Sequence, residues 1–120
     1  MMYTIFTVGD KEYKCKLNTK SLISLEKRLG QNPLNVFMSV SENSLPKLED
    51  MLTIFHESLQ ALQHGITMDE VYDIYDSYIE CGNTFVDFIP VIMDIYKTSG
   101  LIKDDKKSTS KKGKASVEKN

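Results

Sequence analysis

Four acidic residues at helical spacing are the first place in this chain where clustered side chains could do chemistry. Asp69, Asp73, Asp76 and Glu80 follow one another at steps of four, three and four, so on a helix they share one face. Carboxylates bind divalent cations, but a calcium loop places its oxygen ligands along an irregular backbone with a central glycine. Here tyrosines interleave with the acids instead. We therefore expect a solvated acidic face and no metal site.

The histidines and cysteines are too scattered to suggest a catalytic cluster. His56 has no nucleophile at a spacing that it could activate, which indicates a surface or boundary position, and His64 is expected to add a favourable charge near a helix C-terminus. Cys15 and Cys81 fall in different predicted elements, so we expect both to be buried, reduced and unreactive. Glycine-rich phosphate loops and serine elbows are missing from the sequence. We expect a non-enzymatic protein with no catalytic residues and no cofactor.

A β-hairpin is the first element predicted to position these residues. Met2–Val8 is β-branched and aromatic, Gly9 and Asp10 form a turn pair, and apolar residues alternate with lysines over Glu12–Leu17. An isolated hairpin is marginally stable in water, so its apolar face must rest on helices. The expected members of that face are Tyr13, Cys15, Leu17 and Phe6 with either Val8 or Ile5.

Apolar residues at helical spacing predict four to five helices after the hairpin. Their starts and ends are set by capping side chains, prolines and glycines. The expected segments are Asn18 or Thr19 to Leu29, a short helix after Pro33, Leu45 or Pro46 to about Leu62 capped by Ser44, Thr67–Cys81 with a Thr67–Glu70 capping box, and about Asn83 to Thr98, in which Pro90 bends the helix or marks its true first turn. The predicted fold class is α+β, mainly α, with an N-terminal β-hairpin followed by these helices in one small domain.

Composition divides the chain into a folded domain over residues 1–102 and a disordered basic tail over residues 103–120. The tail holds seven lysines against three acidic residues, or +4, so residues 1–102 carry −6 of the total of −2. Val117 is the only larger apolar residue in the tail, and burial therefore cannot offset the entropy of ordering it. The tail also lacks aromatic residues and arginine, so we expect no specific nucleic-acid recognition.

Targeting signals are also missing from the sequence. It contains no apolar run of transmembrane length and no secretory leader pattern. We therefore expect a protein of the cytoplasm that does not insert into a membrane.

Three short stretches carry a family resemblance: LEKRLGQNPL at 25–34, LQALQHGITMDEVYD at 59–73 and IYKTSG at 95–100. In this order, over about residues 3–102, they resemble the tail assembly chaperones of long-tailed phages and prophages of Gram-positive bacteria. The resemblance implies a protein of the host bacterial cytoplasm, absent from the mature virion. Such a protein binds the tape measure protein, keeps it soluble and helps to recruit tail tube subunits. Self-association and a frameshifted longer product are also implied.

Such a chaperone needs an exposed apolar surface for amphipathic helices of its client. The candidate partner-binding residues are Phe37, Met38, Val40 and Met51, because methionine adapts to varied partners and residues 33–44 are the least committed to the core. A core position is the alternative for each of them. Two other functions stay open, namely a small adaptor or regulatory module and a weak nucleic-acid binder that acts through the basic tail.

Overall fold

A two-stranded antiparallel hairpin opens the fold, as predicted. In the computed structural model, which describes residues 2–38 and 45–103, β1 (Thr4–Val8) pairs with β2 (Lys11–Cys15), and Phe6 lies opposite Tyr13. Gly9 takes a φ of 61° in the turn, a conformation that costs glycine little. Val8 is buried and Ile5 is half exposed, so Val8 is the residue that joins Phe6 on the apolar face.

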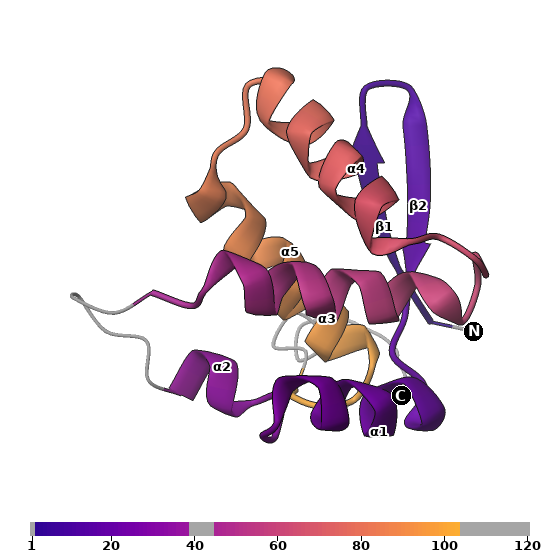
Figure 1. Ribbon diagram of the computed structural model, residues 1–120, viewed down its shortest axis with the longest axis vertical. Helices are drawn as coiled ribbons and strands as arrows, with labels where there is room; N and C mark the ends of the chain where they lie inside the picture. The colour runs from indigo at the N-terminus through magenta and orange to yellow at the C-terminus, as the bar shows by residue number, and fades with distance from the viewer. Residues whose placement is uncertain (1, 39–44, 104–120) are drawn as a thin grey trace.

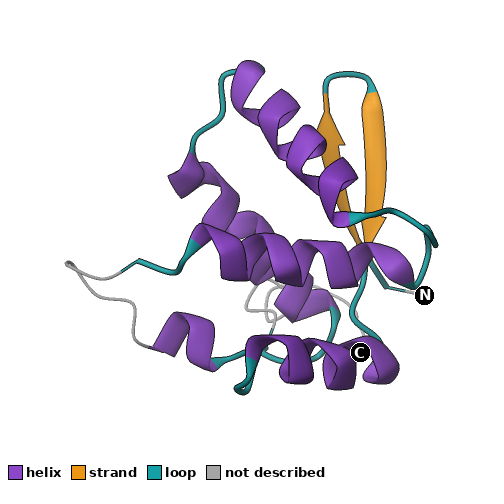
Figure 2. Ribbon diagram, in the orientation of Figure 1, coloured by secondary structure: helices purple, strands orange, loops and turns teal. Residues whose placement is uncertain are grey.

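Five helices follow the hairpin (Figures 1 and 2), which confirms the predicted fold class. Helices hold 57% of the described residues and strands 10%, so the chain is mainly α. The helices are α1 (Thr19–Leu29), α2 (Asn35–Met38), α3 (Leu48–Gln60), α4 (Met68–Glu80) and α5 (Phe85–Thr98).

Aromatic rings join the hairpin to three of the helices. The ring centroid of Phe6 lies 5.0 Å from that of Phe55 on α3, 5.0 Å from Tyr78 on α4 and 5.8 Å from Phe88 on α5. The contacts with Phe55 and Phe88 are edge-to-face and that with Tyr78 is tilted, and aromatic contacts at these separations add to the stabilisation from burial. Phe6 is thus the hairpin residue that contacts all three helices, beside the buried Val8 and Cys15, and α3 contacts the hairpin, α1, α4 and α5.

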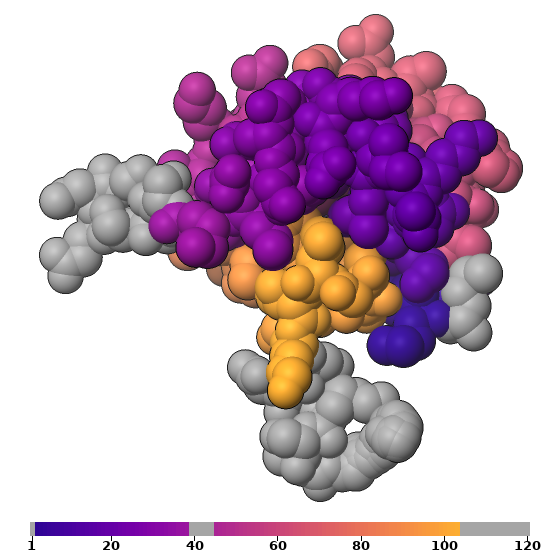
Figure 3. Space-filling model, turned by 90° about the horizontal axis from the view of Figure 1, so that it is seen from below, coloured from indigo at the N-terminus to yellow at the C-terminus, as the bar shows by residue number. Residues whose placement is uncertain are grey.

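Segments near the two ends of the described chain, indigo and orange in Figure 3, lie side by side. The Leu17 amide donates to Ser99 Oγ at 2.9 Å, and the hydroxyls of Thr4 and Thr98 are 3.0 Å apart. These hydrogen bonds hold the beginning of the fold against the C-terminal end of α5. The basic tail that composition predicts lies, apart from Lys103, outside the described residues.

Capping signals predicted three helix boundaries correctly. Asn18 accepts a hydrogen bond from the Ser21 amide, and Gly30 ends α1 with a φ of 71°. Thr67 and Glu70 form the predicted capping box at the start of α4, with hydrogen bonds in both directions.

Three other predicted helix limits differ from the observed ones by two or three residues. α3 begins at Leu48, because Pro46 is buried before the helix and Lys47 takes the cap position; the predicted cap, Ser44, lies outside the described residues. The same helix ends at Gln60 and its chain turns at Ala61 and Leu62. α5 begins at Phe85, because Thr84 and Asp87 form a second capping box.

Pro90 lies inside α5, so it does not mark the first turn of that helix. Proline has no amide hydrogen and cannot donate to the carbonyl of Val86, four residues earlier. Both residues are exposed, so water can reach that carbonyl.

Candidate functional site

The acidic stripe of α4 faces solvent. Asp69, Asp73, Asp76 and Glu80 are all exposed, as expected of a solvated face. Within residues 2–38 and 45–103, no group of three or more histidine, cysteine or acidic side chains is placed to hold a metal ion. The stripe therefore contributes charge to the surface.

A polar cluster lies where α1 meets α3, and it centres on a buried carboxylate that the sequence pattern does not single out. Glu57 Oε2 accepts from Arg28 Nη1 at 2.9 Å and from Ser24 Oγ at 2.8 Å. Arg28 Nη1 also lies 2.9 Å from His56 Nδ1, while His56 Nε2 lies 2.8 Å from the carbonyl oxygen of Ile66. The cluster thus ties α1, α3 and the connection to α4 together.

The same geometry defines the protonation state of His56. Since Arg28 can only donate, Nδ1 of His56 must accept, and Nε2 carries the hydrogen that is donated to Ile66. Desolvation and the nearby Arg28 guanidinium lower the pKa of His56, against smaller opposing effects of the Ile66 carbonyl and Glu57. The neutral ring is therefore the form that fits this site, and the boundary position that we predicted for His56 is confirmed by its partial burial.

We expect the free energy of unfolding to fall as the pH is lowered from about 7 to about 5. The unfolded chain binds a proton on His56 more readily than the folded protein does, because the folded pKa is the lower of the two. The stabilisation that the neutral His56 ring provides is therefore complete above the pKa of His56 in the unfolded chain and is lost as the pH falls below it. Urea unfolding of the wild type and of His56→Gln at several pH values measures the effect. If the free energy of unfolding depends on pH equally in both proteins, groups other than His56 cause the pH dependence.

The two cysteines differ in exposure. Cys15 is fully buried on the hairpin, and burial raises its pKa to about 12. Cys81 is exposed at the C-terminal end of α4, so the prediction that it is buried was wrong. The reason is that α4 turns its buried stripe, Val71, Ile74 and Tyr78, toward the core, and the helix ends one residue before Cys81. Both thiols are free, as predicted.

The four predicted partner-binding residues do not form one surface. Met38 is 78% exposed, and Phe37 is half buried with its ring 5.5 Å from that of Tyr96. Val40 lies outside the described residues. Met51 is fully buried because α3 turns it into the core, so its assignment to an exposed surface is corrected. Of the three that the structure describes, Met38 is the one that is plainly available to a partner.

An apolar groove lies instead between α3 and α4. It has a volume of about 480 Å³, and its lining is mostly apolar. Leu52 and Tyr75 are buried or half buried at its base, whereas Tyr72 is 49% exposed and Leu48 is 37% exposed. The remaining lining residues are Met68, Glu49 and Asp76. We call these seven residues the α3–α4 groove.

The sequence contains a signal for this groove that the predicted partner-binding residues leave out. Tyr72 stands beside the acidic stripe of α4, outside the buried stripe of Val71, Ile74 and Tyr78. A large aromatic side chain on the solvated side of a helix often marks a binding surface. Leu48 is at helical spacing from the core of α3, but it is the first residue of the helix and stays partly exposed.

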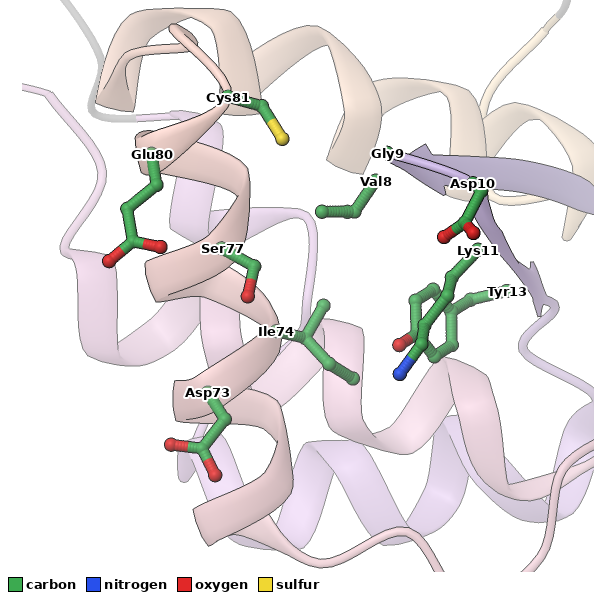
Figure 4. A pocket seen from close by; sticks show the side chains of 10 residues that line it. All are labelled: Val8, Gly9, Asp10, Lys11, Tyr13, Asp73, Ile74, Ser77, Glu80 and Cys81. Atoms are coloured by element: carbon green, nitrogen blue, oxygen red, sulfur yellow. The ribbon is translucent and has the colours of Figure 1, made fainter.

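A second hollow of about 430 Å³ lies between the hairpin and α4 (Figure 4). Ile74 and Ser77 face Val8 and Tyr13 across it, with Lys11 at the hairpin side. Tyr13 and Ile74 belong to the core or pack against it, so most of the apolar wall already has partners. This hollow lacks the exposed aromatic side chain that distinguishes the α3–α4 groove.

Comparison with known proteins places the chain in a family. No match was found among curated proteins or among solved structures. In the part of the chain that the structure describes, no helix has the length and apolar character needed to cross a membrane. The model of a family of unknown function, DUF6096, matches residues 3–120 and so includes the lysine-rich C-terminal segment. Because the match covers nearly the whole chain, the protein belongs to the DUF6096 family.

Proposed function

We propose that this protein is a non-enzymatic tail assembly chaperone of a long-tailed phage or prophage. In this proposal it binds the tape measure protein in the cytoplasm of the host bacterium, keeps it soluble and helps to bring tail tube subunits to it. It is absent from the mature virion, and the family resemblance also implies a frameshifted longer form.

The observation that carries the proposal is the α3–α4 groove. A chaperone of a long helical client needs an exposed apolar groove that accepts an amphipathic helix. Tyr72 and Leu48 offer apolar surface at the edges of such a groove, and Leu52 and Tyr75 close its base. The groove is open to solvent and its edge residues Tyr72 and Leu48 are exposed, which suits a helix of another polypeptide better than a small substrate.

The family resemblance supports the same proposal. The stretch at 59–73 spans the end of α3 and the beginning of α4, and it includes the Thr67–Glu70 capping box and the exposed Tyr72. The resemblance therefore falls on the connection between the two helices of the groove.

Co-expression tests this proposal. The genes beside this one identify the client, since a tail tube gene before it and a gene for a very long coiled-coil protein after it are expected. We expect that the long protein is mostly insoluble when expressed alone and mostly soluble when this chain is present. The soluble fraction after centrifugation is the measurement, and an unrelated small acidic protein is the control. Equal insolubility with and without this chain would refute the chaperone role.

A further inference from the structure

We propose that the α3–α4 groove holds an amphipathic helix that carries lysine or arginine residues on both sides of its apolar stripe. This inference rests on the proposed function and names the chemistry of the client segment. The distribution of charge around the groove supports it.

The middle of the chain has no basic side chain other than its two histidines. Between Lys47 and Lys97 there is no lysine or arginine, whereas residues 1–47 contain seven. The same middle segment, which forms α3, α4 and most of α5, holds ten of the seventeen acidic residues. These ten are Glu49, Asp50, Glu57, Asp69, Glu70, Asp73, Asp76, Glu80, Asp87 and Asp94.

The groove lies within this acidic half and has a carboxylate on each wall. Glu49 comes from the first turn of α3 and Asp76 from the third turn of α4, and both are exposed. In the described parts of the chain, the ion pair present is that of Arg28 with Glu57, away from the groove. A helix lying in the groove would therefore meet negative charge on both sides, which favours a cationic partner.

The apolar floor of the groove requires that the bound helix also carry an apolar stripe. Leu52, Tyr75 and Met68 present apolar surface between the two carboxylates. On a helix, apolar residues at i, i+3, i+4 and i+7 form a stripe that matches such a groove, and the neighbouring positions point to its rims. Leucines in the stripe with lysines at these neighbouring positions satisfy both requirements.

Two other occupants fit less well. The chain's own basic tail has the charge, but Val117 is its only larger apolar residue. A second copy packed symmetrically through the same surface would bring Glu49 and Asp76 against the same carboxylates of its partner, and like charges repel. A helix from another polypeptide is the occupant that supplies apolar and positive groups together.

Binding of two labelled peptides to the full chain tests this inference. Each peptide is about 18 residues long, or five helical turns, with the same leucine stripe, and carries either lysine or glutamate beside that stripe. We expect the lysine peptide to bind at least about tenfold more tightly by fluorescence anisotropy, with affinity that falls as salt is added. Tyr72→Ala should weaken its binding about tenfold. Glu49→Gln combined with Asp76→Asn should reduce the preference for lysine by about fivefold.

Ile23→Ala is the matched control, because Ile23 is half exposed on α1 and lies outside the groove. We expect this variant to bind like the wild type, and circular dichroism verifies that each variant is folded. Equal affinity for the two peptides, or no effect of Tyr72→Ala, would overturn the inference. Tighter peptide binding after Lys106, Lys107, Lys111 and Lys112 are all changed to glutamine would identify the tail as the occupant instead. A dimer that Tyr72→Ala dissociates in sedimentation would identify a second copy.

The outcomes of the peptide test and of the co-expression test are independent of each other. If the lysine peptide binds at Tyr72 but the tape measure protein stays insoluble, the groove binds cationic helices and the tail chaperone role is wrong. If the tape measure protein is solubilised equally by the wild type and by Tyr72→Ala, the chaperone role stands and the client uses another surface.

Discussion

Phe88→Ala is expected to lower the free energy of unfolding by about 4 kcal/mol. Phe88 is 1% exposed on α5, and its ring lies 5.8 Å from Phe6, 5.8 Å from Phe55 and 5.3 Å from Tyr75 between centroids. The substitution leaves a cavity where the hairpin, α3 and α4 meet, and these rings cannot all move to fill it. Urea unfolding at neutral pH, followed by circular dichroism, measures the change.

Val86→Ala is the control for Phe88→Ala, because Val86 is on the same helix and is 59% exposed. We expect this change to cost less than about 0.5 kcal/mol. Similar losses for the two variants would mean that the aromatic cluster is not the centre of the core. If Phe88→Ala is destabilising but leaves the hairpin intact, the hairpin is held mainly by the hydrogen bonds that the amides of Lys16 and Leu17, just after β2, donate to Ser58 and Ser99.

The order of elements could be predicted from sequence because its signals are local. Asn18 and Gly30 bound α1, and Thr67 with Glu70 opens α4, through contacts within a few residues. The same kind of signal was present at Thr84 and Asp87, three residues apart, and would have placed the start of α5 correctly. The start of α3 could not be predicted in this way, because Pro46 is tolerated in a first helical turn and only tertiary packing buries it before the helix.

The groove and the polar cluster depend on contacts between distant segments. Glu57 follows His56 in sequence, but its partner Arg28 lies 29 residues earlier. The groove forms where α3 packs against α4, and the connection between them is tied to α3 by hydrogen bonds of His56 and Gln60 to the Ile66 carbonyl. Met51 illustrates the same limit, since its type suits either a binding surface or a core and only the packing of α3 decides for the core. The spacing of apolar residues predicts which face of a helix is buried, whereas only the fold shows which element packs against that face.

The polar cluster and the groove are linked through α3 and the connection that follows it. His56 and Gln60 of α3 both hydrogen-bond the carbonyl oxygen of Ile66, at 2.8 and 2.9 Å, just before α4 begins. Arg28 holds His56 from the side of α1. The hydrogen bonds that keep α4 in place against α3 therefore include groups from α1, although α1 does not line the groove. Loss of Arg28 is therefore expected to lower the stability of the fold more than it changes the geometry of the α3–α4 groove.

Arg28→Ala is expected to lower the free energy of unfolding by about 2–3 kcal/mol. The change removes the ion pair of Glu57, whose side chain is 9% exposed, and leaves that charge without a basic partner in the described parts of the chain. This loss of unfolding free energy is smaller than that expected for a fully buried ion pair, because the Arg28 side chain is 31% exposed and water can reach Glu57 once it is removed. Urea unfolding at neutral pH is the measurement, with the exposed neighbour Lys27→Ala as a control expected to cost less than about 0.5 kcal/mol.

A double-mutant cycle separates the ion pair from the other contacts of Arg28. Because replacing both members of a buried pair by apolar residues is often nearly neutral, Arg28→Met combined with Glu57→Leu should cost less than Arg28→Ala alone. If the double variant instead loses as much unfolding free energy as Arg28→Met and Glu57→Leu lose together as single variants, Arg28 and Glu57 act independently. The main partner of Arg28 would then be His56, and Arg28→Ala would cost no more than His56→Gln.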